Sequence, residues 1–95
     1  MKRIVWNSEK ADLLRNNPAR GNVGFEECLL AIEENRVLDI IPNSSSNHPG
    51  QEMLVLEING YAFCVPFVET GDEIFLKTVF PSRKHTAIYL TGSRQ

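Results

Sequence analysis

Four consecutive residues near the carboxyl terminus, Ser82-Arg83-Lys84-His85, have the side chains that chemistry at a phosphate group requires. Arg83 and Lys84 could hold phosphate oxygens, and His85 could transfer a proton, because a free imidazole titrates near neutral pH. Tyr89 follows His85 by four residues, a spacing that places both side chains on the same face of a helix. This segment is therefore the first candidate for a functional site.

The residues just before this segment predict how it is positioned. Alternate residues from Ile74 to Phe80 would point to opposite faces of a strand, and Pro81 ends that strand because it cannot donate to a β-ladder. Ser82 can then cap a short helix. Arg83 and Lys84 would fall in its first turn, where the helix dipole disfavours cations. Either they bind an anion there or they are solvated surface side chains, and the sequence leaves both interpretations open.

Charged residues are unevenly distributed along the chain, although the net charge is only −2. Residues 1–23 hold five cations and two acids, residues 24–75 hold ten acids and one cation, and residues 76–95 hold four cations and no acid. If the two ends meet in space, they form a basic surface that suits a polyanion. Lys77 would join Arg83 and Lys84 if its face of the strand is concave. Arg36, the cation of the acidic middle, should play no part.

The remaining patterns predict the elements that must carry this site. Helices are expected near Ser8–Asn16, with Ser8 as the cap, and near Gly24–Asn35, where apolar residues recur at helical spacing. Strands are expected at Arg3–Trp6, Val37–Ile41, Glu52–Ile58, Tyr61–Val68 and Ile74–Phe80. The dipeptide Asn59-Gly60 is a strong hairpin signal, because both turn positions need positive φ. Pro66 predicts a bulge or an unpaired stretch.

The predicted fold is a small α+β domain of order β-α-α-β-β-β-β-α. Its last four strands form an antiparallel sheet, two N-terminal helices cover one face, and a short C-terminal helix follows. The first strand could join the sheet at an edge or centrally. One domain should span residues 1–95, with residues 92–95 frayed.

Cysteine usage and hydropathy predict the compartment. The two cysteines, Cys28 and Cys64, have apolar neighbours and no CxxC spacing, which indicates reduced, buried side chains in a cytoplasmic protein. No apolar run approaches the roughly 18 residues of a membrane span, and the first residues do not resemble a secretory signal. We therefore expect a cytoplasmic protein with no membrane partner.

Short motifs spread over the chain resemble those of the BrnT family. They are Trp6 followed by Lys10-Ala11, then Val23-x-Phe25-Glu26-Glu27, a strand hairpin, and Arg83-Lys84-x-Thr86. BrnT proteins are toxins of type II toxin–antitoxin systems with a RelE-like fold. The resemblance implies a small cytoplasmic endoribonuclease that cuts RNA and arrests translation. Its partners would be a cognate antitoxin and mRNA, either free or on the ribosome.

The resemblance also implies roles for individual residues. Arg83 and Lys84 match the paired cations of the family, and Arg20 matches a basic position. RNA cleavage through the 2′-hydroxyl needs a base, an acid and cations at the phosphate. The candidate catalytic residues are Arg83, Lys84, His85 and Lys77, and the candidate RNA-binding residues are Arg20, Lys10, Tyr61 and Tyr89. The sequence contains no metal-ligand motif, and we expect neither a metal nor another cofactor.

A second hypothesis belongs to a different class of function. The chain could be a non-catalytic interaction module of the same fold, which binds a protein partner through a sheet edge and its acidic surface. Convergence of Lys77, Arg83 and Lys84 with Arg20 on one concave surface would favour the ribonuclease, and their dispersal would favour the module. The sequence leaves a homodimer open in either case.

Overall fold

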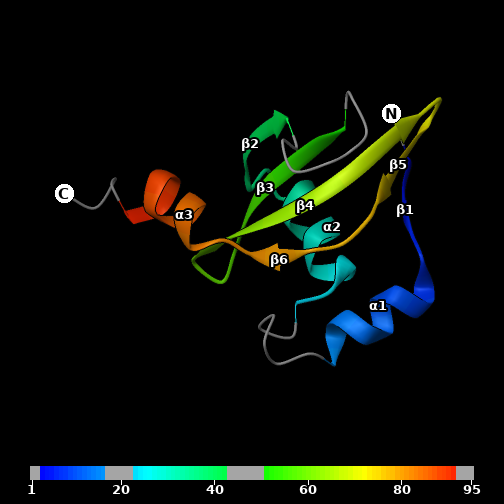
Figure 1. The fold of residues 1–95 in the computed structure, drawn as a ribbon, viewed down its shortest axis with the longest axis horizontal. Helices are drawn as coiled ribbons and strands as arrows, with labels where there is room; N and C mark the ends of the chain where they lie inside the picture. The colour runs from blue at the N-terminus through cyan, green and yellow to red at the C-terminus, as the bar shows by residue number, and fades with distance from the viewer. Residues whose placement is uncertain (1–2, 17–22, 43–50, 92–95) are drawn as a thin grey trace.

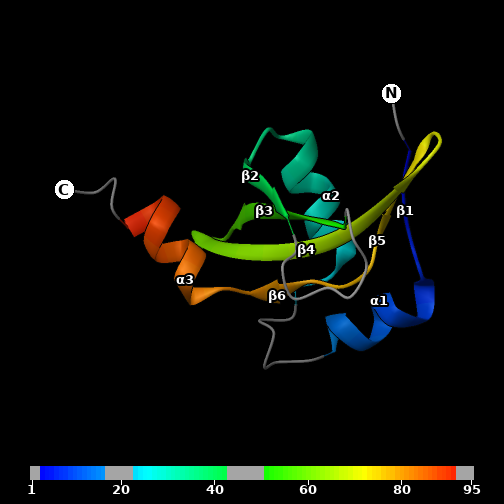
Figure 2. The same ribbon diagram turned by 45° about the horizontal axis from the view of Figure 1, so that its top comes forward.

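A six-stranded β-sheet carries the helices of this protein (Figures 1 and 2). The computed structural model describes residues 3–16, 23–42 and 51–91. The strands are β1 (Arg3–Trp6), β2 (Val37–Pro42), β3 (Glu52–Ile58), β4 (Tyr61–Thr70), β5 (Glu73–Leu76) and β6 (Phe80–Pro81). The helices are α1 (Ser8–Arg15), α2 (Phe25–Glu33), α3 (Arg83–Thr86) and the π-helix η2 (Ala87–Thr91). The predicted α+β class is therefore confirmed. None of the described helices is long and apolar enough to cross a membrane.

The centre of the sheet is the predicted antiparallel hairpin. Its strands run in the order β1-β5-β4-β3-β2, and β6 pairs separately with β4. Strands β3 and β4 are joined by Asn59 and Gly60, whose φ angles are 56° and 79°. Both are positive, as a two-residue turn that matches the strand twist requires, so the turn prediction is confirmed.

The strands from β2 to β5 are antiparallel to their neighbours, as predicted, but the first strand makes the sheet mixed. β1 lies at one edge and pairs in parallel with β5, with Ile4 opposite Ile74 and Trp6 opposite Leu76. This register puts all four side chains on the face that packs into the main core. A period of two determines which residues share a face, but it does not determine strand direction.

The single strand predicted from Ile74 to Phe80 is interrupted, and the sheet has six strands instead of the five in the predicted order. β5 pairs with residues 67–70 of β4, and β6 pairs with Phe63 and Cys64. Pro66 lies at this interruption. Its carbonyl accepts a hydrogen bond from the Lys77 N–H at 2.8 Å. In a strand, the N and the carbonyl of one residue point to the same side, so the missing N–H of Pro66 also faces the interruption.

Pro66 does not produce the predicted bulge. On the β3 side, β4 continues in register through Pro66, which lies opposite Met53. The irregularity between paired strands is instead in β2, between Val37 and Asp39. The irregularity beside Pro66 lies in the neighbouring segment, where residues 77–79 belong to neither β5 nor β6.

Two clusters of apolar side chains fill the two faces of the sheet. Helices α1 and α2 cover the first face, as predicted, and pack against alternate residues of β3 and β4 such as Leu56 and Val65. Phe25 is fully buried there, with its ring stacked 5.6 Å from that of Trp6. The second face holds Met53, Val55, Ala62 and Cys64, against which Tyr89 and Leu90 of η2 pack. The C-terminal segment therefore lies on the side of the sheet opposite to α1 and α2.

The two N-terminal helices lie where they were predicted, with one corrected cap. Asn7, not Ser8, caps α1: its backbone is extended and its side chain accepts a hydrogen bond from the Lys10 N–H at 2.9 Å. Ser8 is already the first helical residue, because Asn at the N-cap can satisfy the same donor. At the start of α2, the Glu27 carboxylate accepts a hydrogen bond from the Gly24 N–H at 2.8 Å.

The two cysteines are free and buried, which confirms the prediction. Cys28 belongs to the cluster on the first face and Cys64 to the cluster on the second, so the sheet separates them. Burial raises the pKa of the Cys28 thiol to about 12. The Cys28 side chain is therefore a protonated, unreactive part of the core.

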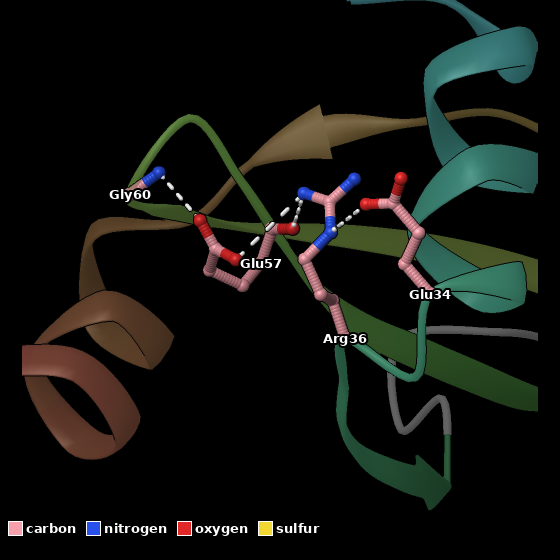
Figure 3. Close-up of polar contacts among 4 residues, drawn as sticks. All are labelled: Glu34, Arg36, Glu57 and Gly60. Carbon is pink, nitrogen blue, oxygen red and sulfur yellow. Dashed lines mark hydrogen bonds and ion pairs between the residues drawn. The ribbon is translucent and has the colours of Figure 1, made fainter.

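Arg36 links the end of α2 to the β3–β4 hairpin (Figure 3). Its Nη1 donates to the Glu57 carbonyl at 2.8 Å, and its Nε donates to the Glu34 carboxylate at 3.0 Å. Glu57 in turn donates its N–H to the Arg36 carbonyl and accepts from the Gly60 N–H. This cation of the acidic middle therefore has a structural role that the sequence did not indicate.

We expect Arg36→Glu to lower the free energy of unfolding by about 1–3 kcal/mol, because it removes a charged donor from a backbone carbonyl and places a third carboxylate beside two others. Chemical denaturation gives this value. Glu34→Gln is the matched control: its side chain is 53% exposed, so the change should be below about 1 kcal/mol. Equal stability of Arg36→Glu and the wild type would show that the network contributes nothing.

Candidate functional site

The candidate site lies where α3 leaves the sheet. Ser82 caps α3 as predicted, since its Oγ accepts a hydrogen bond from the His85 N–H at 3.2 Å. Arg83 and Lys84 therefore occupy the first turn, as the sequence indicated. The helix continues as η2 through residue 91, so His85 and Tyr89 belong to one continuous helical segment.

Thr86 fastens this segment to β4. Its buried hydroxyl accepts from the Ala62 N–H at 2.9 Å and donates to the Ser82 carbonyl at 2.7 Å. A third hydrogen bond runs from the Ser82 N–H to the Ala62 carbonyl at 2.9 Å. Because a buried backbone donor without a partner is costly, these bonds fix the start of α3 against the strand. The side chains on either side of Thr86 are held in place with it.

His85 and Tyr89 form the centre of the site. Their rings are nearly parallel, with an interplanar angle of 5° and centroids 6.3 Å apart. The Tyr89 hydroxyl donates to Oδ2 of Asp39 on β2, and Oδ1 of Asp39 accepts from the Ile40 N–H at 2.8 Å. Imidazole, phenol and carboxylate are thus brought together from two distant parts of the chain.

The bond between Tyr89 and Asp39 sets the charge of both groups. It lowers the pKa of the Asp39 carboxyl, and the Ile40 N–H lowers that pKa further. Burial opposes this decrease, and the nearby His85 makes the smallest contribution to it. The same bond, with smaller contributions from burial and from the charge of Asp39, raises the pKa of the Tyr89 hydroxyl. At neutral pH the site therefore contains an ionised Asp39 and a protonated Tyr89.

The cations nearest in sequence to this centre are exposed. Arg83 and Lys84 both point into solvent, and within the described ranges neither is held in an ion pair. Lys77, in the link between β5 and β6, is also exposed, and its Nζ lies 5.5 Å from the centroid of the Phe75 ring. Two exposed cations are thus adjacent to His85, while Lys77 is engaged with a side chain of β5.

The structure does not gather all the predicted RNA-binding residues around this centre. Lys10 is exposed on α1, on the other side of the sheet. Tyr61 is half-buried; it packs against the first-face core and its ring contacts Phe63 edge-on. Of that predicted set, Tyr89 alone is shown beside His85. The predicted concave surface would include Arg20, which lies outside the described residues.

Sequence reasoning did not single out Asp39, nor the contact between Ser82 and the His85 ring. Asp39 is a charged residue within the apolar run 37–41, and that is a signal that it has a polar partner. The partner, Tyr89, lies fifty residues away, and strand periodicity does not identify it. The hydrogen bonds of Thr86 were equally unpredictable, because they depend on how α3 docks on β4.

Comparisons with known proteins gave no match: no family model, no curated protein and no solved structure resembles this chain closely enough to be aligned with it. Among the residues that the structure describes, no group of three or more His, Cys, Asp or Glu side chains is arranged to hold a metal ion. The chemistry of the site therefore has to be argued from its own residues.

Proposed function

We propose that this protein is an endoribonuclease that cuts RNA without a metal ion. The observation that carries the proposal is the His85–Tyr89 pair, which is anchored to two strands and shares a helical segment with the exposed Arg83 and Lys84. A proton-transfer group next to two cations is the combination that cleavage of a phosphodiester needs.

The reaction consistent with these residues is transesterification. The 2′-oxygen forms a bond to phosphorus while the bond from phosphorus to the 5′-oxygen breaks. The Tyr89 proton is held by Asp39, so His85 is the group left to act. His85 accepts the proton of the 2′-hydroxyl and returns it to the 5′-oxygen. Arg83 and Lys84 bind the phosphate oxygens, whose negative charge increases in the transition state.

The biological setting of the proposal comes from the BrnT resemblance. The protein would be the toxin of a type II toxin–antitoxin pair, acting on mRNA in the cytoplasm with a RelE-like arrangement of its strands. The α+β class and the position of Arg83 and Lys84 in the first turn of α3 are compatible with that resemblance. A cognate antitoxin would be its protein partner.

The alternative, a non-catalytic interaction module, is supported by the outer edge of β2. Ile40 is 52% exposed there, which would suit an added strand. However, the Ile40 N–H already donates to Asp39, so this edge offers one backbone donor fewer to a partner. The ribonuclease accounts for the arrangement of Asp39, Tyr89 and His85, and we favour it for that reason.

The test is cleavage of single-stranded RNA by purified protein, alongside growth of bacteria that express it alone. Wild type should cut RNA and arrest growth. The double variant Arg83→Ala, Lys84→Ala should lose activity by about 10²-fold or more. Its stability should change by only a few tenths of a kcal/mol, because both side chains are exposed at a helix start.

The matched control is Arg3→Gln, an exposed cation on β1 that is paired with Glu73 and lies at the far end of the sheet from α3 (Figure 1). It should cut RNA as wild type does. A double variant as toxic and as active as wild type would end the assignment of Arg83 and Lys84 to the site. Absence of cleavage by the wild type would favour the interaction module.

A further inference from the structure

Two polar side chains that have no role in the proposed reaction contact the His85–Tyr89 pair. They are Ser82, at the start of α3, and Asp39, on β2. We infer that both are positioning residues, which hold the ring of His85 so that its Nε2 is the atom that exchanges protons with RNA. This inference rests on the proposed ribonuclease function and assigns the atom through which His85 acts.

Ser82 determines which ring nitrogen of His85 is available. Its Oγ lies 2.6 Å from Nδ1 of His85. The Sγ of Cys64, a fully buried residue, lies 3.5 Å from the same nitrogen. Nδ1 therefore faces the second-face cluster and is already hydrogen-bonded. Among the residues that the structure describes, Nε2 has no hydrogen-bond partner, so it is the nitrogen left to exchange protons with a ligand.

The hydroxyl of Ser82 also determines which tautomer the His85 imidazole adopts. Its oxygen accepts from the His85 backbone N–H and can also accept from a proton on Nδ1, which leaves Nε2 as the nitrogen that takes up a proton. In the neutral imidazole, one nitrogen carries a proton and the other accepts a hydrogen bond. The ring nitrogens are therefore not equivalent, and removal of the hydroxyl should change how the proton is distributed between them.

Asp39 acts on His85 through Tyr89. Both of its carboxylate oxygens are occupied, one by the Ile40 N–H and the other by the Tyr89 hydroxyl. An ionised carboxylate with both oxygens engaged is a poor proton acceptor, so Asp39 is not itself the base. Its effect is to fix the phenol ring, which lies parallel to the imidazole and limits the rotation of His85.

The groups that face His85 are consistent with Ser82 and Asp39 as positioning residues and His85 as the group that exchanges protons. Asp39 approaches from β2, Cys64 from β4 and Tyr89 from η2, while Arg83 and Lys84 share its own turn. Burial raises the pKa of the Cys64 thiol, and the bond to Asp39 raises the pKa of Tyr89. Cys64 and Tyr89 therefore remain protonated at neutral pH, and proton exchange falls to His85.

The test combines NMR with RNA cleavage in the full-length protein. The ¹⁵N shifts of the ring nitrogens report which one is protonated, and His48, the other histidine, is the internal reference. In Ser82→Ala, the shifts of the two His85 nitrogens should change while those of His48 stay constant, and cleavage should fall about tenfold. Ser82→Thr keeps the hydroxyl and should restore both, which separates this effect from simple loss of the cap.

Asp39→Asn and Tyr89→Phe test the second positioning residue. In Asp39→Asn, Tyr89 should titrate at a lower pH than in wild type, measured by tyrosinate absorbance in a Tyr61→Phe background. Both variants should slow cleavage with little change in KM, because they disturb the ring and not the phosphate contacts. Unchanged His85 shifts in Ser82→Ala, or unchanged kcat in both Asp39→Asn and Tyr89→Phe, would overturn the inference. Altered shifts together with an inactive wild type would instead overturn the ribonuclease function and leave the positioning of His85 in place.

Discussion

A His85→Ala variant should fold normally and cut RNA about 10²- to 10⁴-fold more slowly than wild type, the usual contribution of a general acid–base group. The imidazole is half-buried, and its loss removes one hydrogen bond with Ser82, the contact with the Cys64 Sγ and one ring contact with Tyr89. None of these losses opens a large cavity, so the effect on stability should be small. Loss of activity in a folded protein is therefore the expected signature.

The chain provides its own control for this experiment. His48 is the other histidine, the sequence gives it no role, and it lies outside the described residues. His48→Ala should cut RNA at the wild-type rate. Single-turnover cleavage at saturating protein is the measurement, since it separates chemistry from binding. If His85→Ala and His48→Ala were equally active, His85 would not be the proton-transfer group.

Phe25→Ala should have the largest effect on stability, a loss of about 3–5 kcal/mol. The Phe25 side chain is 0% exposed, stacks on Trp6 and starts α2. Its removal leaves a cavity between the helix and the first face of the sheet. A domain of this size has a total stability of roughly 5–15 kcal/mol, so the variant should be partly unfolded at growth temperature.

Urea denaturation, followed by circular dichroism, measures this loss. Leu30→Ala is the matched control, because Leu30 belongs to the same helix and is 49% exposed. Its cost should be below about 1 kcal/mol. Similar costs for the two variants would mean that α2 is not packed on the sheet through Phe25.

The sequence predicted the elements better than their arrangement. Helical spacing located α2, and the Asn59-Gly60 dipeptide located the central turn, because each depends on neighbouring residues alone. The direction of β1 depends on pairing with residues 70 positions away, and the interruption between β5 and β6 depends on pairing with residues 16 to 18 positions away. Periodicity is the same for both strand directions, so it could not decide them.

In the candidate site too, the sequence predicted the local features but not the contacts between distant segments. The helix start at Ser82 and the shared face of His85 and Tyr89 follow from local spacing, and the structure has both. Asp39 was missed because its partner is distant in sequence. Charge counting placed Lys10 in the same set as Tyr89, yet α1 covers the opposite side of the sheet. A count along the chain contains no information about which face an element covers.

The two faces of the sheet are built from alternate residues of one strand, β4. Phe63 and Val65 belong to the core beneath α1 and α2, whereas Ala62 and Cys64 contact the segment that carries His85. A deletion or insertion of one residue in β4 would exchange the two sets, because side chains alternate with a period of two. Changes of length within this strand therefore cannot alter the site and spare the core. If the site is to vary, it must do so by substitution or through the segments after residue 76.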